Sequence, residues 1–323
     1  MLGTSRAQGQ REAVRAIIRS AGFDRVGFAS AGKAPSSGHF NTWLERGFAG
    51  EMSYMRRDIG RRQDPRLVLE GARTVIATAV HYREAGFPDS TQAPGTARIA
   101  AYAQGTDYHR VVERRLKSAC ASLNEQFPAT YRWYVDTGPV LERDWAQAAG
   151  IGWIGKNTCT IDPERGSYFF IAVILTTLEL DPDEPSVNHC GSCRACIDAC
   201  PTAAIVAPYE LDSRLCISYL TIEHRGPMPG NLEQKVGNWV FGCDVCQDVC
   251  PFNQRDRAGL SSDPHLAPRP ENRTPRLADL ATLDEAGFRA RFPRSAVRRA
   301  KHEGFRRNVL AALGNSMGPP PAT

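Results

Sequence analysis

The hydrophobic positions near the N-terminus first follow the spacing of a helix and then that of a strand. Val14, Ile17 and Ile18 lie three or four residues apart or side by side, so they share one face of a helix. Gly22 follows this run and is a typical end signal. Residues 25–29 come next and predict a short strand.

Strands and helices alternate further along the chain. In chain order we expect a buried strand at 74–80, an amphipathic helix at 111–127, a strand at 131–135, a helix at 141–149 and strands at 158–161 and 167–178. The run 162–166, Asp-Pro-Glu-Arg-Gly, has the composition of a turn, which predicts a hairpin from the last two strands. The alternation predicts a mixed α/β (α+β) fold.

The composition changes after residue 180. The stretch 181–185 is acidic and contains two prolines, which favours a linker, and the region beyond it is rich in cysteine. We predict a large N-terminal domain at 1–180, a cysteine-rich domain at 181–254 and a basic helical segment at 255–323. The tail at 318–323 is expected to be disordered.

Eight of the ten cysteines fall in two runs or between them. The first run contains Cys190, Cys193, Cys196 and Cys200 and ends in Cys-Pro; Cys216 follows, and the second run contains Cys243, Cys246 and Cys250. In bacterial ferredoxins with the spacing of the first run, three close thiolates hold one iron-sulfur cube and the fourth, before proline, holds another. The pattern predicts a one-electron redox protein.

The same rule distributes the thiolates over two 4Fe-4S clusters. Cluster one takes Cys190, Cys193, Cys196 and Cys250, and cluster two takes Cys200, Cys216, Cys243 and Cys246. Structural zinc is the alternative, but its ligands usually come as two separated pairs. Disulfides are disfavoured because the cysteines are crowded rather than spread. Of the other two, Cys120 is expected to be apolar and buried in a helix, and Cys159 is expected in a strand.

The net charge of +5 is concentrated in one segment. Between residues 287 and 307 eight basic residues face a single glutamate, so the rest of the chain is slightly negative. Such a stripe suits phosphates, although a charge run is more often a solvated helix face. The candidate nucleic-acid contacts are Arg298, Arg299, Lys301, Arg306 and Arg307.

Two motifs in the N-terminal domain match known signatures in the wrong context. The run 150–155 fits the glycine pattern of dinucleotide sites, but a helix precedes it where a strand is required, so we expect these glycines to let the backbone approach another ligand. Asp136-Thr137-Gly138 is the aspartic-protease triplet, but it occurs once and the mechanism needs two carboxylates. Asp136 stays of interest because it ends a predicted strand, where α/β folds place catalytic groups.

Length and hydropathy limit the functional classes. The chain before the first cluster cysteine is long enough for a domain with its own core, which a simple electron carrier would not need. The longest apolar stretch, 169–175, is far shorter than a membrane span, and no N-terminal segment reads as an export leader. We expect a soluble, cytoplasmic, monomeric protein with no membrane contact.

A set of motifs in a fixed order resembles the epoxyqueuosine reductase family. They are Tyr102-x-x-Gly105-x-Asp107-Tyr108-His109, the stretch from Val135 to Arg143, Gly152-Trp153-Ile154-Gly155-Lys156-Asn157, Gly166-Ser167-Tyr168, the two cysteine runs, the stretch from Leu215 to Glu223, and Arg307-Asn308 with Ala312-Leu313-Gly314-Asn315. They cover most of the chain.

The resemblance implies an enzyme that removes the epoxide oxygen of epoxyqueuosine in the anticodon loop of tRNA. It implies base-off cobalamin in the N-terminal domain, two 4Fe-4S clusters and a low-potential electron donor. The position that matches the proton donor is Asp136, whose pKa would then have to be raised by burial or by a partner. Those that match cobalamin contacts are Arg62, Ala100, Asp136, Thr160, Ile171, Ser218, Thr221, Cys243 and Asp244.

One departure and two alternatives go with this resemblance. Some members of the family end in a HEAT-like repeat domain, and we expect the basic stripe to take over its tRNA contacts here. A cobalamin-dependent reductive dehalogenase would share the cofactors, but it would be expected to carry a twin-arginine export leader, and we recognise none in this sequence. A ferredoxin-type electron-transfer protein would leave the N-terminal domain without a task.

Overall fold

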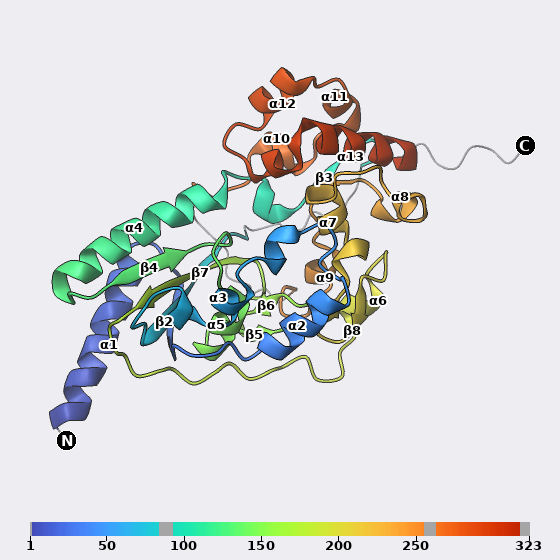
Figure 1. The fold of residues 1–323 in the computed structure, drawn as a ribbon. Coiled ribbons are helices and arrows are strands. Elements are labelled where there is room, and N and C mark those ends of the chain that lie inside the picture. Colours follow the sequence, from blue (N-terminus) through green and yellow to red (C-terminus); the bar gives the residue numbers. More distant parts are fainter. Residues whose placement is uncertain (1, 84–92, 255–262, 317–323) are drawn as a thin grey trace, which may run out of the picture.

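The computed structural model describes residues 2–83, 93–254 and 263–316, with side chains described from residue 7 onwards. An antiparallel sheet of four strands lies at its centre, in the order β1-β2-β7-β4 (Figure 1). The strands are β1 (Arg25–Ser30), β2 (Thr74–His81), β4 (Tyr131–Tyr134) and β7 (Phe169–Thr176). The predicted mixed α/β fold is confirmed, and the tail prediction lies outside the described residues.

Helices cover both faces of the sheet, which is why every residue of β2 is buried. Helices α1 (Leu2–Ser20) and α4 (Tyr108–Gln126) pack on the face that carries Ile76 and Val80 (Figure 1). Helix α5 (Glu142–Ala148) packs on the other face, against Val75 and Ala77. Successive side chains of a strand point to opposite faces, so a strand covered on both sides is apolar throughout.

The predicted hairpin at 158–178 is wrong in its strand pairing. Its turn is present, because Asp162 and Gly166 exchange backbone hydrogen bonds of 2.9 and 3.0 Å. However, β6 (Thr160–Ile161) pairs with β5 (Trp153–Ile154), whereas β7 pairs with β2 and β4. A Cβ on Gly152 would lie 2.3 Å from the carbonyl oxygen of Ile161. We had expected this glycine to let the backbone approach a ligand. The close approach is instead to another part of the chain.

Shorter elements make up the rest of the N-terminal and cysteine-rich parts. They are α2 (Ser37–Glu45), η1 (Ser53–Arg56), α3 (Ile59–Gln63), η2 (Pro65–Leu67), β3 (Arg98–Ile99), η3 (Ala101–Ala103), α6 (Ala195–Asp198), β8 (Ile205–Ala207), β9 (Glu210–Leu211), η4 (Ser213–Leu215), α7 (Ile217–Ile222), α8 (Gly230–Val236), β10 (Trp239–Phe241) and α9 (Val245–Asp248). The predicted linker is held in place, since the Asp183 carboxylate accepts from the backbone N–H of Phe28 at 2.8 Å and pairs with Arg15 at 3.0 Å.

The C-terminal helices share a core with earlier parts of the chain. They are α10 (Pro270–Arg273), α11 (Leu277–Ala281), α12 (Glu285–Arg291), η5 (Ala296–Ala300) and α13 (Lys301–Ser316). Phe292 and Phe305 pack in one cluster with Ile99 and Phe241, and β3 and β10 pair in parallel. The division into three domains stays a prediction, because this hydrophobic cluster contains residues from all three predicted ranges. Among the described residues, no helix has the length and apolar character needed to cross a membrane.

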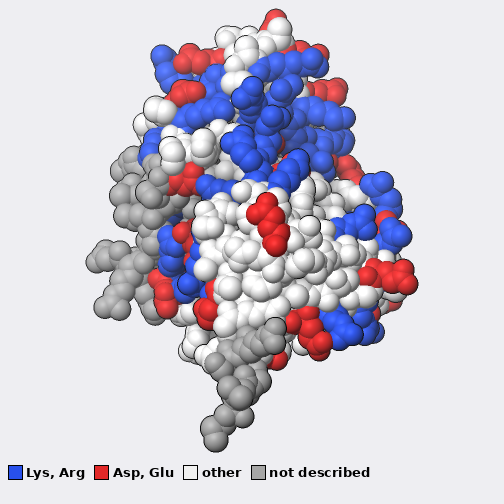
Figure 2. Space-filling model, turned by 90° about the vertical axis from the view of Figure 1, so that its left-hand side faces the viewer, with Lys and Arg blue, Asp and Glu red and all other residues white. Residues whose placement is uncertain are grey.

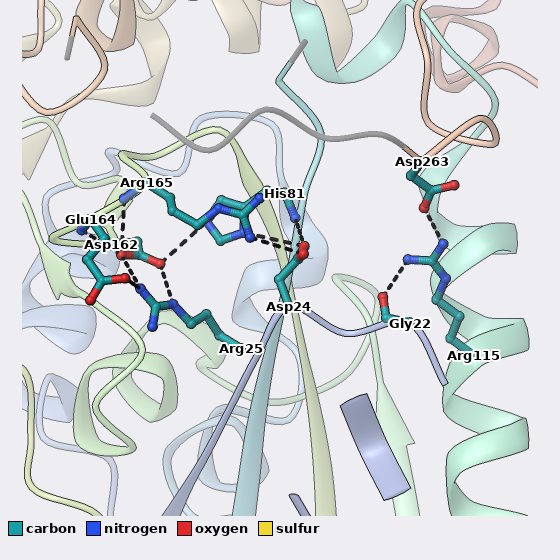
Figure 3. A network of polar contacts seen from close by, with 9 residues as sticks. All are labelled: Gly22, Asp24, Arg25, His81, Arg115, Asp162, Glu164, Arg165 and Asp263. Carbon is teal, nitrogen blue, oxygen red and sulfur yellow. Dashed lines mark hydrogen bonds and ion pairs between the residues drawn. The ribbon is translucent and has the colours of Figure 1, made fainter. Parts of the chain in front are cut away.

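A polar network joins β1 and β2 to the turn after β6 (Figure 3). His81, at the end of β2, is buried between two carboxylates, Asp24 Oδ2 at 3.4 Å and Asp162 Oδ2 at 3.5 Å. Arg25 binds Asp162 at 2.8 Å, and Arg165 binds Asp24 at 3.0 Å. The charges of this cluster are therefore compensated within the cluster.

Candidate active site

Asp136 lies on a tight turn just beyond β4. Its φ of 58° is in the left-handed region, which is unusual for a residue other than glycine and often marks a functional position. Its backbone N–H donates to Glu142 Oε1 at 2.8 Å, at the start of α5. A Cβ on Gly138 would lie 2.4 Å from the Tyr134 ring, so the turn requires glycine there.

His109 joins Asp136 to a second carboxylate. Its Nε2 lies 3.3 Å from Asp136 Oδ2, and its Nδ1 lies 2.8 Å from Asp107 Oδ1. Asp107 is the residue before α4 and also accepts from the His109 backbone N–H at 3.1 Å. Tyr108 stacks on Phe170 of β7 with ring centroids 4.2 Å apart and hydrogen-bonds Asp136. The first turn of α4 thus faces the Asp136 turn.

The hydrogen bonds set the protonation of this cluster. Burial acts to raise the pKa of Asp136, but the hydrogen bonds from His109 and Tyr108 outweigh it and lower that pKa. Burial acts to lower the pKa of His109, and the hydrogen bonds to Asp107 and Asp136 raise it to about 9. Burial, with the charge of Asp136, raises the pKa of Glu142 to about 8. The expected raised pKa of Asp136 is thus wrong for this state: His109 and Glu142 hold the protons.

Four of the predicted cobalamin contacts come together around Gly242. The backbone N–H of Gly242 donates to Thr221 Oγ1 at 2.9 Å, and a Cβ at this glycine would lie 2.5 Å from that of Ala100. Cys243 and Asp244 follow directly, and Asp244 Oδ2 accepts from the Ala101 backbone N–H at 2.7 Å. Burial raises the pKa of Asp244 to about 7.

The other predicted contacts fit a large ligand to different degrees. The hydroxyl of Thr160 is buried and makes no hydrogen bond, and Ile171 is partly exposed in the half of β7 that pairs with β2 but not with β4. Both features suit a bound group beside the sheet, because buried polar atoms are normally paired. The Arg62 guanidinium donates to the carbonyls of Tyr54 at 3.0 Å and Gly138 at 3.4 Å. Ser218 is half-buried in α7, two residues after Cys216.

The thiols predicted for cluster one line a single small cavity. Cys190, Cys193, Cys196 and Cys250 share it with His189 and Phe252. Trp153 Nε1 donates to the Cys190 sulfur at 3.4 Å. Burial, with the charges of its cysteine neighbours, raises the pKa of Cys196 to about 11. Cys193 is exposed, so this cavity lies near the surface.

The thiols predicted for cluster two form a deeper group. Burial raises the pKa of Cys243, and the charge of Cys216 raises it further. Burial also raises the pKa of Cys216, and the charge of Cys200 adds to that effect. Cys243 and Cys216 act likewise on Cys246. Within the described ranges, no three His, Cys, Asp or Glu side chains form a site for a single metal ion.

The two cysteines outside the clusters differ in their surroundings. Cys120 lies in α4 as predicted, and burial raises its pKa to about 12. Cys159 lies one residue before β6 rather than in the strand, and its thiol is hydrogen-bonded to Cys246. Sequence reasoning missed this contact, because the spacing of Cys159 links it to neither run.

The basic side chains gather over the C-terminal helices, at the top of the view in Figure 2. Arg298, Lys301 and Arg306 are exposed. Arg307 instead donates to the carbonyls of Leu220, His224 and Gly226, at 2.5, 2.9 and 2.6 Å. It holds α13 to the chain after α7, so we leave it out of the proposed nucleic-acid surface.

A second basic segment escaped the sequence analysis because it is short and contains an aspartate. Arg56, Arg57, Arg61 and Arg62 lie in or next to η1 and α3. It meets the C-terminal stripe where the Arg299 guanidinium lies 5.8 Å from the centroid of the Tyr54 ring. The contacts of Asp136 with His109 and Glu142 were missed too, although both residues stand in the motifs that carry the resemblance.

Comparison with known families gives two matches. Residues 62–137 match the family described as "Epoxyqueuosine reductase QueG, DUF1730". Residues 189–253 match the "4Fe-4S double cluster binding domain". The first range contains Asp136 and His109, and the second contains all eight predicted cluster cysteines.

Curated relatives and solved structures match over most of the chain. The epoxyqueuosine reductase of Gloeobacter violaceus is 44% identical over 309 residues, which cover 94% of this chain and 95% of the relative. That of Xanthomonas campestris is 40% identical over 94% of this chain and 86% of the relative. A crystal structure of epoxyqueuosine reductase with an epoxyqueuosine-modified tRNA-Tyr stem loop superposes with a TM-score of 0.88 at 30% identity, covering 96% of this chain and 82% of that one. The Streptococcus thermophilus structure gives 0.85 at 29% identity, covering 94% and 81%.

Proposed function

The chain belongs to the epoxyqueuosine reductase family of oxidoreductases, and we propose that it reduces epoxyqueuosine to queuosine in the anticodon loop of tRNA with base-off cobalamin and two 4Fe-4S clusters. The matches to relatives include the N-terminal domain, which an electron carrier would not need. The partner would be tRNA, since a structural relative binds a modified stem loop. A low-potential electron donor would supply the clusters.

The position of Tyr102 is the observation that carries this proposal. Burial raises its pKa, and the charges of Asp136 and Asp244 both add to the effect, so this partly buried ring is within reach of both carboxylates. Asp136 belongs to the group that carries protons, and Asp244 follows Cys243 of cluster two. The proposed proton carriers and electron carriers thus both come close to one partly buried ring.

The reaction needs both kinds of carrier. Opening the epoxide and releasing its oxygen as water, with a carbon–carbon double bond left behind, consumes two electrons and two protons. The clusters pass electrons one at a time, and cobalamin, when bound, supplies a metal centre that stores reducing power for bond cleavage. Arg62, Ala100, Thr160, Ile171, Ser218, Thr221, Cys243 and Asp244 are the residues proposed to hold it, with Asp136 facing it.

Asp136 and His109 would deliver the proton as a pair. The Asp136 side chain is 64% exposed and His109 only 28%, so Asp136 is the member that a substrate can touch. At neutral pH the shared proton rests on His109, whose pKa is about 9. Substrate oxygen that gains negative charge would draw this proton through Asp136. Asp107 would hold the imidazole in position.

Cluster one is proposed as the entry point for electrons and cluster two as the exit. The exposed Cys193 brings cluster one to the surface, where a donor can approach. The thiols of cluster two lead to Cys243 and Asp244, beside the proposed cobalamin contacts. Arg298, Lys301 and Arg306 are proposed to bind tRNA phosphates.

The test is anaerobic reconstitution with iron, sulfide and cobalamin, followed by reaction with epoxyqueuosine-bearing tRNA and a low-potential chemical reductant and by nucleoside analysis. We expect about eight irons per chain, one cobalamin and conversion to queuosine. Cys193→Ser should remove cluster one and stop turnover, whereas the matched Cys120→Ser should keep both clusters and the activity. Absence of queuosine with the fully loaded protein would refute the proposal.

A further inference from the structure

Tyr54 and Arg299 come from opposite ends of the chain and meet beside Asp136. Tyr54 lies in η1 and Arg299 in η5, with the guanidinium over the aromatic ring. The Tyr54 carbonyl is tied through the Arg62 guanidinium to the carbonyl of Gly138, in the turn of Asp136. Burial acts to raise the pKa of Asp136, and the positive charge of Arg299 helps to lower it, after the stronger effects of His109 and Tyr108. Arg299 is thus a member of the basic stripe whose charge reaches the site.

Glu223 fixes the orientation of the Arg299 guanidinium. Arg299 Nε donates to one carboxylate oxygen at 3.0 Å and Nη2 to the other at 3.2 Å. The Glu223 side chain is 18% exposed and that of Arg299 is 56% exposed. The carboxylate therefore holds the guanidinium from the inner side, while the outer side faces solvent. A fork of this kind removes the freedom of a long side chain before a ligand arrives.

The backbone of Arg299 is held as well. Arg225 donates to the carbonyl of Arg299 and to that of Ala300, both at 3.2 Å. The backbone N–H of Arg225 donates to Glu51 at 3.1 Å. Half-exposed ion pairs contribute little to stability, so stability alone does not require this much support. Support of this kind is expected where a side chain must be held in place before a ligand binds.

We propose that Arg299 forms a subsite for one phosphate of the nucleotide chain next to the reacting base, with Glu223 as its positioning residue. The inference rests on the proposed function, since it takes the nucleic acid as substrate. A modified base that reaches Asp136 brings its flanking phosphates along, and an arginine fork is the group that binds phosphate with a defined direction. Arg57 and Arg61, exposed on the other basic segment, add favourable charge on the Tyr54 side.

The test measures binding, so it is independent of turnover. Stem loops that carry epoxyqueuosine are made with a neutral methylphosphonate at each phosphate flanking the modified nucleotide in turn. Binding to the protein reconstituted with iron, sulfide and cobalamin is followed by fluorescence anisotropy. At one flanking position, the neutral linkage should weaken binding to the unmodified protein about tenfold, and it should have almost no effect on the Arg299→Ala protein.

Arg298→Ala is the matched control, because it removes a neighbouring exposed arginine of the same short helix. This variant should keep its sensitivity to the same methylphosphonate. Glu223→Ala should weaken binding in the unmodified protein and have no further effect in Arg299→Ala. If the Arg299→Ala protein is as sensitive to each flanking methylphosphonate as the unmodified protein, the proposed subsite is wrong. If the unmodified protein binds the stem loop but never converts it, the proposed function fails and the subsite stands.

Discussion

Two histidines of this protein each lie between two aspartates, and their surroundings give them different tasks. His81 is 1% exposed, and its neighbour Asp162 is completely buried. Asp162 is also bound by Arg25, and Asp24 by Arg165, so both carboxylates have a cationic partner besides the histidine (Figure 3). The cluster joins β1 and β2 to the turn before β7. It is placed to stabilise the fold.

His109 has the same two kinds of neighbour but faces solvent. Asp136, its partner at 3.3 Å, is 64% exposed and stands on a strained turn. No arginine forms an ion pair with this carboxylate among the described residues, and Arg299 acts on it only from a distance. The comparison teaches that an Asp-His-Asp arrangement becomes reactive when one carboxylate is left open to a substrate.

We call Asp107, His109 and Asp136 the open cluster, and Asp24, His81 and Asp162 the closed cluster. The largest expected effect is on catalysis at the open cluster. Asp136→Asn and His109→Gln should each lower the turnover of epoxyqueuosine-bearing tRNA by about a thousandfold, because the proton pathway is cut. Iron and cobalamin content and the Tm should change little, since both side chains are partly exposed. The matched variant Asp24→Asn, in the closed cluster, should turn over normally. Normal rates in Asp136→Asn would remove the distinction between the clusters.

The closed cluster should respond in stability instead. Asp162→Asn takes the buried carboxylate away from Arg25, which keeps only the exposed Glu164 as a partner, and this should cost about 3 kcal/mol in the free energy of unfolding. Urea unfolding of the metal-free protein measures this change, with Glu164→Gln as a control on the exposed partner of Arg25. The folded fraction of Asp162→Asn should retain its rate per bound cobalamin.

The open cluster should make the turnover rate depend on pH in the alkaline range, and the closed cluster should make stability depend on pH in the acidic range. His109 has a raised pKa of about 9, so its proton is present below that value and is lost above it. The turnover rate should be level to about pH 8 and fall roughly tenfold per unit above pH 9. Asp162 has a lowered pKa of about 2, so its contribution to stability is present above the ordinary value of about 4 and disappears as the pH falls through about 2. A rate that stays level to pH 10 would contradict His109 as the proton source.

The smallest effect is expected at Glu142. Its pKa of about 8 leaves it mostly protonated at neutral pH, and its task is to accept the backbone N–H of Asp136. Glu142→Gln preserves that hydrogen bond, so the rate should change by only about twofold. Glu142→Leu removes the acceptor and should lower the rate further. Equal rates in the two variants would show that the hydrogen bond does not hold the turn.

Features with a local cause were predictable from the sequence. The helix and strand positions followed from the spacing of apolar residues, because the backbone periods are the same in every protein. The grouping of Cys190, Cys193 and Cys196 followed from the spacing of cluster ligands, and these thiols do line one cavity. The strand partner of β7 was missed, since its turn permits a hairpin and only the packing of both sheet faces decides otherwise.

The sequence by itself determined the positions of the main helices and strands, the grouping of the cysteines that line one cavity, and the family, because each depends on spacing or identity along the chain. Only the tertiary structure decided that His109 lies within hydrogen-bond distance of Asp136, that Arg307 is used for packing, and that Arg299 reaches Tyr54. Burial and charge in these places come from segments far apart in the chain, and no local pattern records which of them meet. The protonation of the site is therefore a property of the fold.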